Sequence, residues 1–178
     1  MTDSDFIPQS KTKQLLLTNG EFTIVDEEDY EFLRQWNWHP DKHGYAYRRE
    51  LIGKLPNGNR KFKRILMHKV IMNRHICQEI DHKNGDVKNN SKNNLRPATH
   101  QQNMMNRRKN EECSSKYKGV YRLKRYTNKW EAYVNFNSKK NYIGLFNDEI
   151  TAAKAYNKLA TELFGEFARL NQIPDLVD

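Results

Sequence analysis

The stretch that decides the fold runs from residue 79 to residue 107. It reads Glu79-Ile80-Asp81-His82-Lys83-Asn84-Gly85-Asp86, then Asn94-Leu95-Arg96, then Gln101-Gln102-Asn103. Residues 80–99 predict two short β-segments joined by a long polar loop, Lys83–Asn93, and a helix is expected from about Thr99 to Arg107. Because adjacent residues of a strand point to opposite sides, the side chains of Asp81 and His82 are expected to take separate chemical roles.

Three side chains in this stretch, Asp81, His82 and Asn103, suit the hydrolysis of a phosphodiester. That reaction needs a base that accepts a proton from water near neutral pH, and histidine has the appropriate unperturbed pKa. It also needs a hard cation, and Mg²⁺ prefers oxygen ligands such as those of Asp and Asn. An isolated Asp-His pair is a weak signal, since an Asn-rich loop often holds such residues in turns. The complete pattern, including the Asn-Leu-Arg-Pro segment at 94–97, favours the catalytic interpretation.

From about Leu66 to Arg107 the chain resembles the HNH, or ββα-metal, homing endonuclease family of phage type. The resemblance implies that Asp81 and Asn103 bind a metal and that His82 is the general base. It counts Asn94, nine residues before Asn103, among the catalytic residues, as the Asn that ties the loop between the two strands. His68 matches an upstream His of phage-type members and is expected to be structural.

The implied cofactor is Mg²⁺ or another divalent cation such as Mn²⁺. No structural zinc is expected, because the two cysteines, Cys77 and Cys113, do not form the paired Cys motifs that hold one. Arg96 and Arg107 are candidates to clamp the phosphate, with an ordinary role as surface arginines the equal alternative.

The charge balance indicates a polyanionic partner. The chain has 31 Lys and Arg against 22 Asp and Glu, a net charge of +9 and a pI of about 9.5. Residues 1–50 hold 6 basic and 10 acidic side chains, which leaves 25 and 12 for residues 51–178. Nucleic acid is the commonest partner of such a surface, and a merely solubilising role is the alternative.

The first half of the chain predicts a β-rich subdomain. We expect a polar, mobile tail over 1–13, a hairpin around Asn19-Gly20, a helix over 29–34 capped by Asp26, and a short helix over 68–74. A second hairpin with a basic tip is expected from segments 45–51 and 61–66 around a turn at 56–59. Four aromatic residues are expected in the core, with base stacking the alternative, and they are Trp36, Trp38, Tyr45 and Tyr47.

Three alternating segments, 118–123, 130–136 and 140–145, predict a three-stranded sheet packed on a helix over about 148–164. Alternation places Trp130, Ala132, Val134 and Phe136 on one face of the second segment. In the third segment it groups Asn141, Ile143 and Leu145 on one face.

This region resembles the AP2 DNA-binding domain, over about Ser114 to Asn171. The motifs that carry the likeness are Ser115-Lys116-Tyr117-Lys118-Gly119-Val120-Tyr121, Lys129-Trp130-Glu131-Ala132, Ile143-Gly144-Leu145-Phe146 and Ala168-Arg169-Leu170-Asn171. By position, the family's DNA contacts fall on Lys118, Tyr121, Leu123, Arg125, Tyr133, Asn135, Lys140 and Tyr142. Since Tyr121 and Leu123 stand where plant members have arginines, the preferred DNA sequence is not implied, and Leu123 is not expected to contact a base.

The sequence thus predicts an α+β protein with five parts. These are a disordered tail (1–13), an HNH nuclease domain with an N-terminal β-rich subdomain (14–107), a linker (108–116), an AP2-like domain (117–171) and a tail (172–178). No apolar run is long enough to span a membrane and the N-terminus is acidic, so a soluble protein without a secretory signal is expected. By the resemblance, it works in the cytoplasm of a bacterial host, encoded by a phage or mobile element.

The predicted function is homing-type cleavage of double-stranded DNA, in which the AP2-like sheet and the basic hairpin choose the site and His82, with one Mg²⁺, cuts. Neither an organic cofactor nor a membrane partner is expected. A non-catalytic DNA-binding regulator on a nuclease-like scaffold is the alternative. RNA binding is a third reading, although the chain has no evident RNA-recognition motif.

Overall fold

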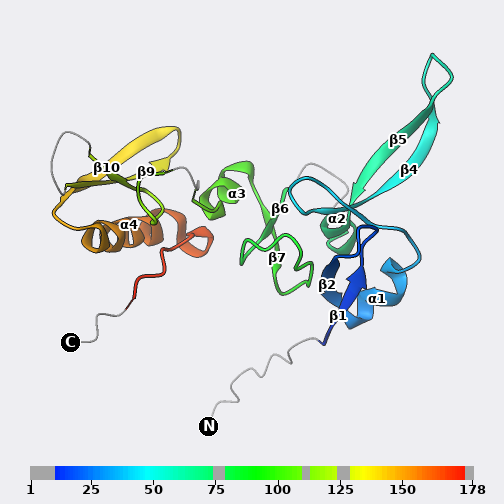
Figure 1. Ribbon diagram of the computed structural model, residues 1–178, viewed down its shortest axis with the longest axis horizontal. Coiled ribbons are helices and arrows are strands. Elements are labelled where there is room, and N and C mark those ends of the chain that lie inside the picture. Colours follow the sequence, from blue (N-terminus) through cyan, green and yellow to red (C-terminus); the bar gives the residue numbers. More distant parts are fainter. Residues whose placement is uncertain (1–10, 74–78, 110–112, 124–128, 175–178) are drawn as a thin grey trace, which may run out of the picture. The chain divides into compact units, whose positions relative to one another are not determined.

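The computed structural model describes residues 11–73, 79–109, 113–123 and 129–174. It is a mixed α and β protein with several small antiparallel sheets and a few helices, as expected for the α+β class (Figure 1). The chain divides into two compact units, Met1–Ala98 and Thr99–Asp178, and each is described by itself. Within the described residues, no helix has the length and apolar character needed to cross a membrane.

The first unit begins with the predicted hairpin, formed by β1 (Thr12–Leu16) and β2 (Phe22–Asp26). Gly20 has a φ of +86°, which glycine adopts readily and which a tight turn requires. Thr12 and Lys13 belong to β1 rather than to the expected tail, and residues 1–10 lie outside the described residues.

Helix α1 (Glu27–Leu33) follows, with Asp26 at its N-cap position. The prediction that Asp26 caps this helix is confirmed for its position but not for its side chain. No side-chain cap bond forms, and the Asp26 carboxylate instead accepts a hydrogen bond of 2.8 Å from the backbone N–H of Lys92.

Strands β3 (His39–Pro40), β4 (Ala46–Lys54) and β5 (Arg60–Leu66) form a three-stranded sheet, so the second predicted hairpin is confirmed. Helix α2 (Met67–Ile71) is shorter than expected, and Arg74 lies outside the described residues. Strands β6 (Glu79–His82) and β7 (Leu95–Ala98) complete the unit. The core consists of Leu15, Leu17, Val25, Leu33, Trp38, Ala46 and Met67. Of the four predicted core aromatics, Trp38 is fully buried, and Trp36, Tyr45 and Tyr47 are half-buried.

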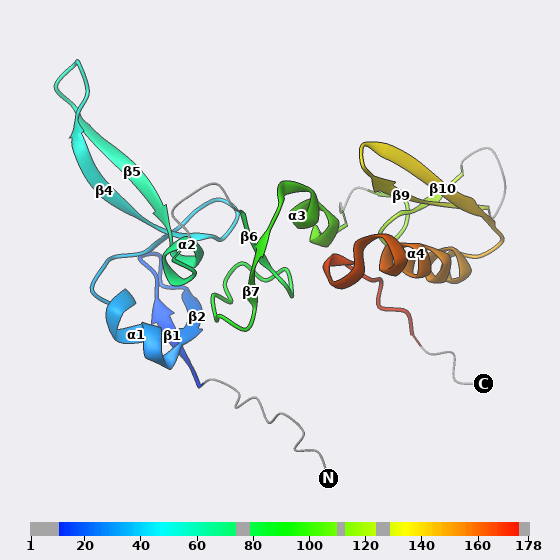
Figure 2. The same ribbon diagram turned by 180° about the vertical axis from the view of Figure 1, so that it is seen from behind.

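The second unit contains α3 (His100–Asn106), the strands β8 (Val120–Arg122), β9 (Trp130–Phe136) and β10 (Lys139–Phe146), α4 (Glu149–Phe164) and a 3₁₀ turn, η1 (Gly165–Phe167) (Figure 2). The strands pair antiparallel in the order β10-β9-β8 and pack on α4, as predicted. Ala132 and Val134 of β9 are fully buried, which confirms the inward face of this strand.

The predicted alternation of the third strand, which grouped Leu145 with Asn141 and Ile143, was wrong at Leu145. A bulge between Tyr142 and Gly144 shifts the register, so that Phe146 pairs with Trp130 and Leu145 pairs with Glu131. As a result, Phe146 packs against the core and Leu145 is exposed.

Helix α3 groups with the second unit rather than with β6 and β7. Thr99 and Gln102 form a capping box at its start, and Met105 packs against the cluster of Val134, Tyr156 and Phe164. The compact units therefore divide at Ala98, whereas the predicted nuclease domain extends to 107. That functional boundary stays a prediction.

Candidate active site

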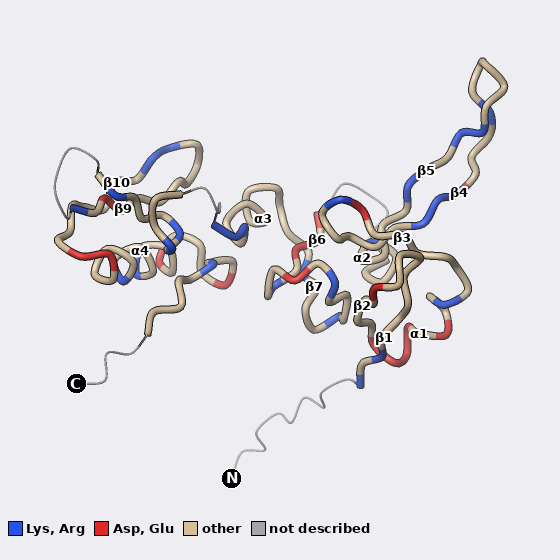
Figure 3. Tube along the Cα trace, viewed as in Figure 1, with Lys and Arg blue, Asp and Glu red and all other residues tan. Residues whose placement is uncertain are grey.

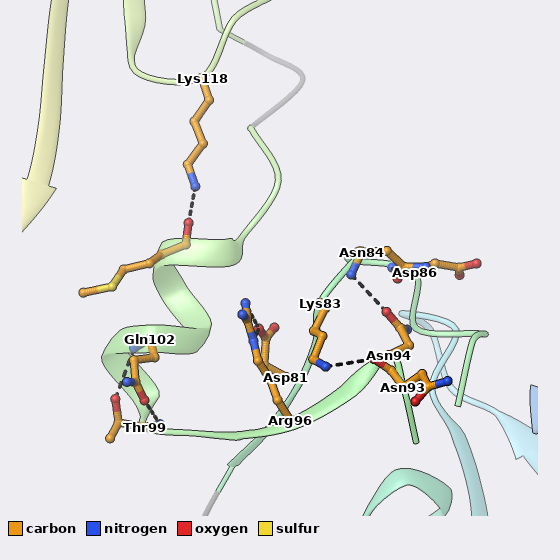
Figure 4. Close-up of polar contacts among 11 residues, drawn as sticks. Asp81, Lys83, Asn84, Asp86, Asn93, Asn94, Arg96, Thr99, Gln102 and Lys118 are labelled. Atoms are coloured by element: carbon orange, nitrogen blue, oxygen red, sulfur yellow. Dashed lines mark hydrogen bonds and ion pairs between the residues drawn. The ribbon is translucent and has the colours of Figure 1, made fainter. Parts of the chain in front are cut away.

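Strands β6 and β7 present the site residues of the first unit. They pair antiparallel with Asp81 opposite Arg96 and His82 opposite Leu95. Asn94 ties the loop between the strands, because its Oδ1 accepts the N–H of Asn84 at 3.0 Å and its Nδ2 donates to the Asn89 carbonyl at 2.7 Å. The first of these bonds is drawn in Figure 4.

The same loop is fastened to β2 by contacts that sequence reasoning missed. The N–H of Ile24 donates to the Lys88 carbonyl at 2.8 Å, and the N–H of Asn90 donates to the Ile24 carbonyl at 2.7 Å. The Thr23 hydroxyl also donates to the Lys88 carbonyl, at 2.7 Å. These bonds make the β1–β2 hairpin the support on which the loop rests.

Asp81 is buried and is held by Arg96. The guanidinium donates to Asp81 Oδ2 from Nε at 2.8 Å and from Nη2 at 2.7 Å (Figure 4). Both side chains are under 10% exposed, at 5% for Asp81 and 9% for Arg96. Charge-assisted bonds of this kind fix the orientation of a carboxylate. In this structure Arg96, a predicted phosphate clamp, therefore orients Asp81.

The tautomer of His82 follows from its neighbours. The single proton of the Thr23 hydroxyl goes to the Lys88 carbonyl, so Thr23 Oγ1 is the acceptor of the 2.8 Å bond from Asn90 Nδ2. Asn90 Oδ1 then faces His82 Nε2 at 3.2 Å and accepts its proton. The neutral imidazole consequently carries its lone pair on Nδ1.

Two aromatic rings, those of His68 and Tyr45, flank His82. The His82 ring lies 5.3 Å from the His68 ring and 5.8 Å from the Tyr45 ring, and His68 and Tyr45 are 5.5 Å apart, all in edge-on contact. Burial lowers the pKa of His82, opposed by its hydrogen bond with Asn90 and by the charges of Asp81 and Asp86. Burial lowers the pKa of His68 to about 3. Both imidazoles are therefore neutral near pH 7.

Asn103 and Arg107 belong to the second unit. Asn103 lies on α3, where its N–H donates to the Thr99 carbonyl at 3.0 Å, and Arg107 is the C-cap residue. The structure thus gathers Asp81, His82 and Arg96 on one β-hairpin and places Asn103 on a helix. Over the described ranges, no group of three or more His, Cys, Asp or Glu side chains is arranged to hold a metal.

The outer face of β8–β10 carries aromatic and amide side chains. The rings of Tyr121 and Tyr133 stack at 4.6 Å with 4° between their planes, and Lys140 Nζ lies 3.9 Å from the centre of the Tyr133 ring. Asn135 and Tyr142 are exposed, Tyr142 at 60%. A cavity of about 500 Å³ adjoins this face. Arg125, another predicted contact, lies outside the described residues.

The Lys118 side chain makes hydrogen bonds that the sequence did not predict. Its Nζ donates to the carbonyls of Met105 at 2.5 Å and Arg107 at 2.8 Å, at the end of α3 (Figure 4 shows the first). Burial lowers its pKa to about 8. The Asn171 side-chain amide bonds to both backbone groups of Lys118. Its Oδ1 accepts the Lys118 N–H at 2.7 Å, and its Nδ2 donates to the Lys118 carbonyl at 3.1 Å. Lys118 therefore joins α3 to the sheet.

The chain matches a known protein over nearly its whole length. It is 33% identical over 174 residues to an uncharacterised HNH endonuclease of Acanthamoeba polyphaga mimivirus, which covers 97% of this chain and 87% of that protein. No protein-family model and no solved structure matches it. At this identity and coverage, the chain belongs to the HNH endonuclease family.

Proposed function

We propose that the chain is a metal-dependent endonuclease that hydrolyses phosphodiester bonds at selected sites in double-stranded DNA, in the manner of the homing-type members. The observation that carries this proposal is the buried, neutral His82, whose tautomer Asn90 fixes, next to Asp81 on one strand of a chain that belongs to the HNH endonuclease family. A neutral imidazole held in one tautomer is what a general base requires.

In the proposed reaction, Nδ1 of His82 accepts a proton from a water that attacks the scissile phosphorus in line. The proton acquired by the ring leaves an imidazolium, which the neighbouring carboxylate of Asp81 and the Asn90 carbonyl oxygen stabilise. The products would be a 5′ phosphate and a 3′ hydroxyl. Protonation of the ring strengthens the hydrogen bond from Nε2–H to the Asn90 carbonyl oxygen, because a charged ring is a stronger donor.

Asp81 and Asn103 are the residues that would hold the metal. Their carboxylate and amide oxygens fit a hard cation, and the Arg96 bonds fix the carboxylate as outer partners of a ligand usually do. Bound Mg²⁺ would neutralise charge on the phosphate and on the departing 3′ oxygen. Two protein ligands are enough for Mg²⁺, which commonly keeps several waters and binds substrate phosphate.

Recognition by the second unit is proposed to follow the AP2-like pattern. The exposure of Asn135 and Tyr142, and the stacked pair of Tyr121 and Tyr133, support a sheet face that meets DNA. Lys140 lies on the same side, although it is paired with Glu131 at 3.0 Å. We further propose a phage-type or mobile-element enzyme that acts in the cytoplasm of a bacterial host.

The test is cleavage of supercoiled plasmid with Mg²⁺ and with EDTA, followed by analysis of the ends. Metal-dependent nicking that leaves 5′ phosphates, and that Asn103→Ala abolishes without loss of DNA binding, is the expected result. DNA binding without cutting in any of several divalent metals would instead establish the non-catalytic regulator.

A further inference from the structure

The hairpin of β4 and β5, residues 46–66, extends from the rest of the first unit as an arm (Figure 1). Lys and Arg occur along both of its strands (Figure 3). Glu50 is its only acidic residue, against seven basic ones, which are Arg48, Arg49, Lys54, Arg60, Lys61, Lys63 and Arg64. Two of its large apolar side chains are also exposed, Leu51 at 57% and Phe62 at 46%.

The strand register divides the arm into two faces, because residues directly opposite each other point to the same side. One face carries the pairs Arg49–Arg64, Leu51–Phe62 and Lys54–Arg60. A bulge between Leu51 and Gly53 returns Lys54 to this face. We call it the basic–apolar face, since an apolar pair lies between two basic pairs. The opposite face carries Arg48–Ile65, Glu50–Lys63 and Gly53–Lys61.

Folding alone does not explain the basic–apolar face. Like charges directly opposite each other destabilise a sheet, and an exposed apolar pair gains nothing from burial. Arg64 is compensated by an ion pair with Asp41 and by the Tyr47 ring at 4.4 Å. Among the residues that the structure describes, no acidic side chain pairs with Arg49, Lys54 or Arg60. A polyanionic partner would remove this repulsion.

The spacing of the two basic pairs fits the major groove of DNA. Arg60 and Arg64 are four residues apart on β5, which corresponds to about 13 Å at the rise of an extended strand. The major groove is about 12 Å wide and admits a two-stranded β-ribbon. With a ribbon laid across the groove, each basic pair would face one phosphate backbone. Leu51 and Phe62, between them, would reach base edges, where the thymine methyl group is the apolar feature.

We propose that the arm binds in the major groove of double-stranded DNA through its basic–apolar face, as a contact separate from the sheet of the second unit. This inference rests on the proposed DNA substrate. It assigns the phosphate contacts to Arg49, Lys54, Arg60 and Arg64, and a preference for thymine-containing sequence to Phe62 and Leu51.

The test measures the affinity of the intact chain for a DNA duplex over a series of salt concentrations, in EDTA so that nothing is cut. Lys54→Gln combined with Arg60→Gln should lower the slope of log affinity against log salt by about 1.8, since each phosphate contact contributes about 0.9. The matched control is Lys61→Gln combined with Lys63→Gln, which removes the same charge from the opposite face and should change the slope by less than about 0.5. Equal effects of the two double variants, or no effect of either, would overturn the proposal.

Phe62→Ala tests the apolar contact. The wild type should bind a duplex in which uracil replaces thymine several-fold more weakly than the thymine duplex, because uracil lacks the methyl group. Phe62→Ala should bind the two duplexes more nearly alike, with an unchanged salt slope. Double-stranded RNA should compete poorly, since side chains do not reach into its deep, narrow major groove. Competition by RNA equal to that by DNA, or an identical uracil penalty in wild type and Phe62→Ala, would contradict the proposal.

These binding measurements separate the arm from the nuclease. If wild type never cuts DNA but the Lys54 and Arg60 substitutions lower the salt slope, the nuclease proposal fails and the proposed DNA contact of the arm stands. If wild type cuts DNA but those substitutions leave the salt slope unchanged, the nuclease proposal stands and the proposed contact of the arm fails.

Discussion

Replacement of Asn90 by alanine is expected to damage both the stability of the first unit and the chemistry of His82. Asn90 is 1% exposed and bonds to His82 Nε2 at 3.2 Å and to Thr23 Oγ1 at 2.8 Å. Its loss leaves these two buried groups without this partner, at about 1–3 kcal/mol each, so Asn90→Ala should lower the free energy of unfolding by about 2–6 kcal/mol. The imidazole would then be free to change tautomer. We expect the rate of DNA cleavage at saturating protein to fall at least about tenfold.

The assay is single-turnover cleavage at a temperature where the variant is folded, with DNA affinity and urea unfolding measured on the same samples. Thr23→Val is the matched control, because it removes the hydroxyl that bonds to Asn90 and Lys88 but keeps the Asn90 amide beside His82. Asn90 retains a weaker bond of 3.4 Å to the Val87 carbonyl. Thr23→Val should lose stability and keep most of its cleavage rate. Wild-type cleavage by folded Asn90→Ala, or an equal rate loss in both variants, would refute the positioning role of Asn90.

Three further results are expected. The pKa of His68 is about 3 in the folded state and near 6.5 in the unfolded state, so the folded state binds fewer protons at acidic pH. The free energy of unfolding is therefore fully retained above pH 6.5 and falls as the pH is lowered toward 3. Urea unfolding at pH 6.5 and 4.5 should show a loss of about 2–3 kcal/mol that is smaller in His68→Phe; equal losses would contradict the assignment. Lys118→Met should speed hydrogen exchange in α3, because the Lys118 amine bonds to carbonyls at the end of that helix. It should leave the salt dependence of DNA binding unchanged. A slope of log affinity against log salt that is lower by about 0.9 would show that Lys118 contacts a phosphate instead. Gly119→Ala should lower the free energy of unfolding by more than about 3 kcal/mol, because at φ +74° its Cβ would lie 2.1 Å from the Tyr156 ring. Gly58→Ala is the control, since Gly58 has a φ of +81° but no atom within 4 Å of the added Cβ, and it should cost only about 1–2 kcal/mol. Thermal unfolding measures the difference.

Local signals predicted the elements well. The Asn19-Gly20 turn, the alternation of 130–136 and the helical spacing after Asp148 each gave a segment that the structure contains. These features depend on neighbours close in sequence, so the sequence reveals them directly. The bulge at Tyr142 was missed because an alternating pattern was extended through it.

Long-range polar contacts could not be predicted in the same way. Thr23 and Asn90 are 67 residues apart, and nothing in an Asn-rich loop identifies which amide becomes buried. One signal was present, since alternation places polar Thr23 on the same face as Val25, and both are 0% exposed. A threonine on the buried face of a strand must find a partner, and here that partner leads to His82. The pairing of Asp26 with Lys92 is hidden for the same reason.

The role of His82 as general base is tested most directly by comparing wild type with His82→Ala on supercoiled plasmid in Mg²⁺, with an EDTA control. Thermal unfolding and DNA affinity of both proteins should first be shown to be alike. Wild type is expected to nick the plasmid only with metal, and His82→Ala is expected to be slower by a factor of about 10² or more. Cleavage by folded His82→Ala at the wild-type rate would contradict the assignment of His82 as the general base.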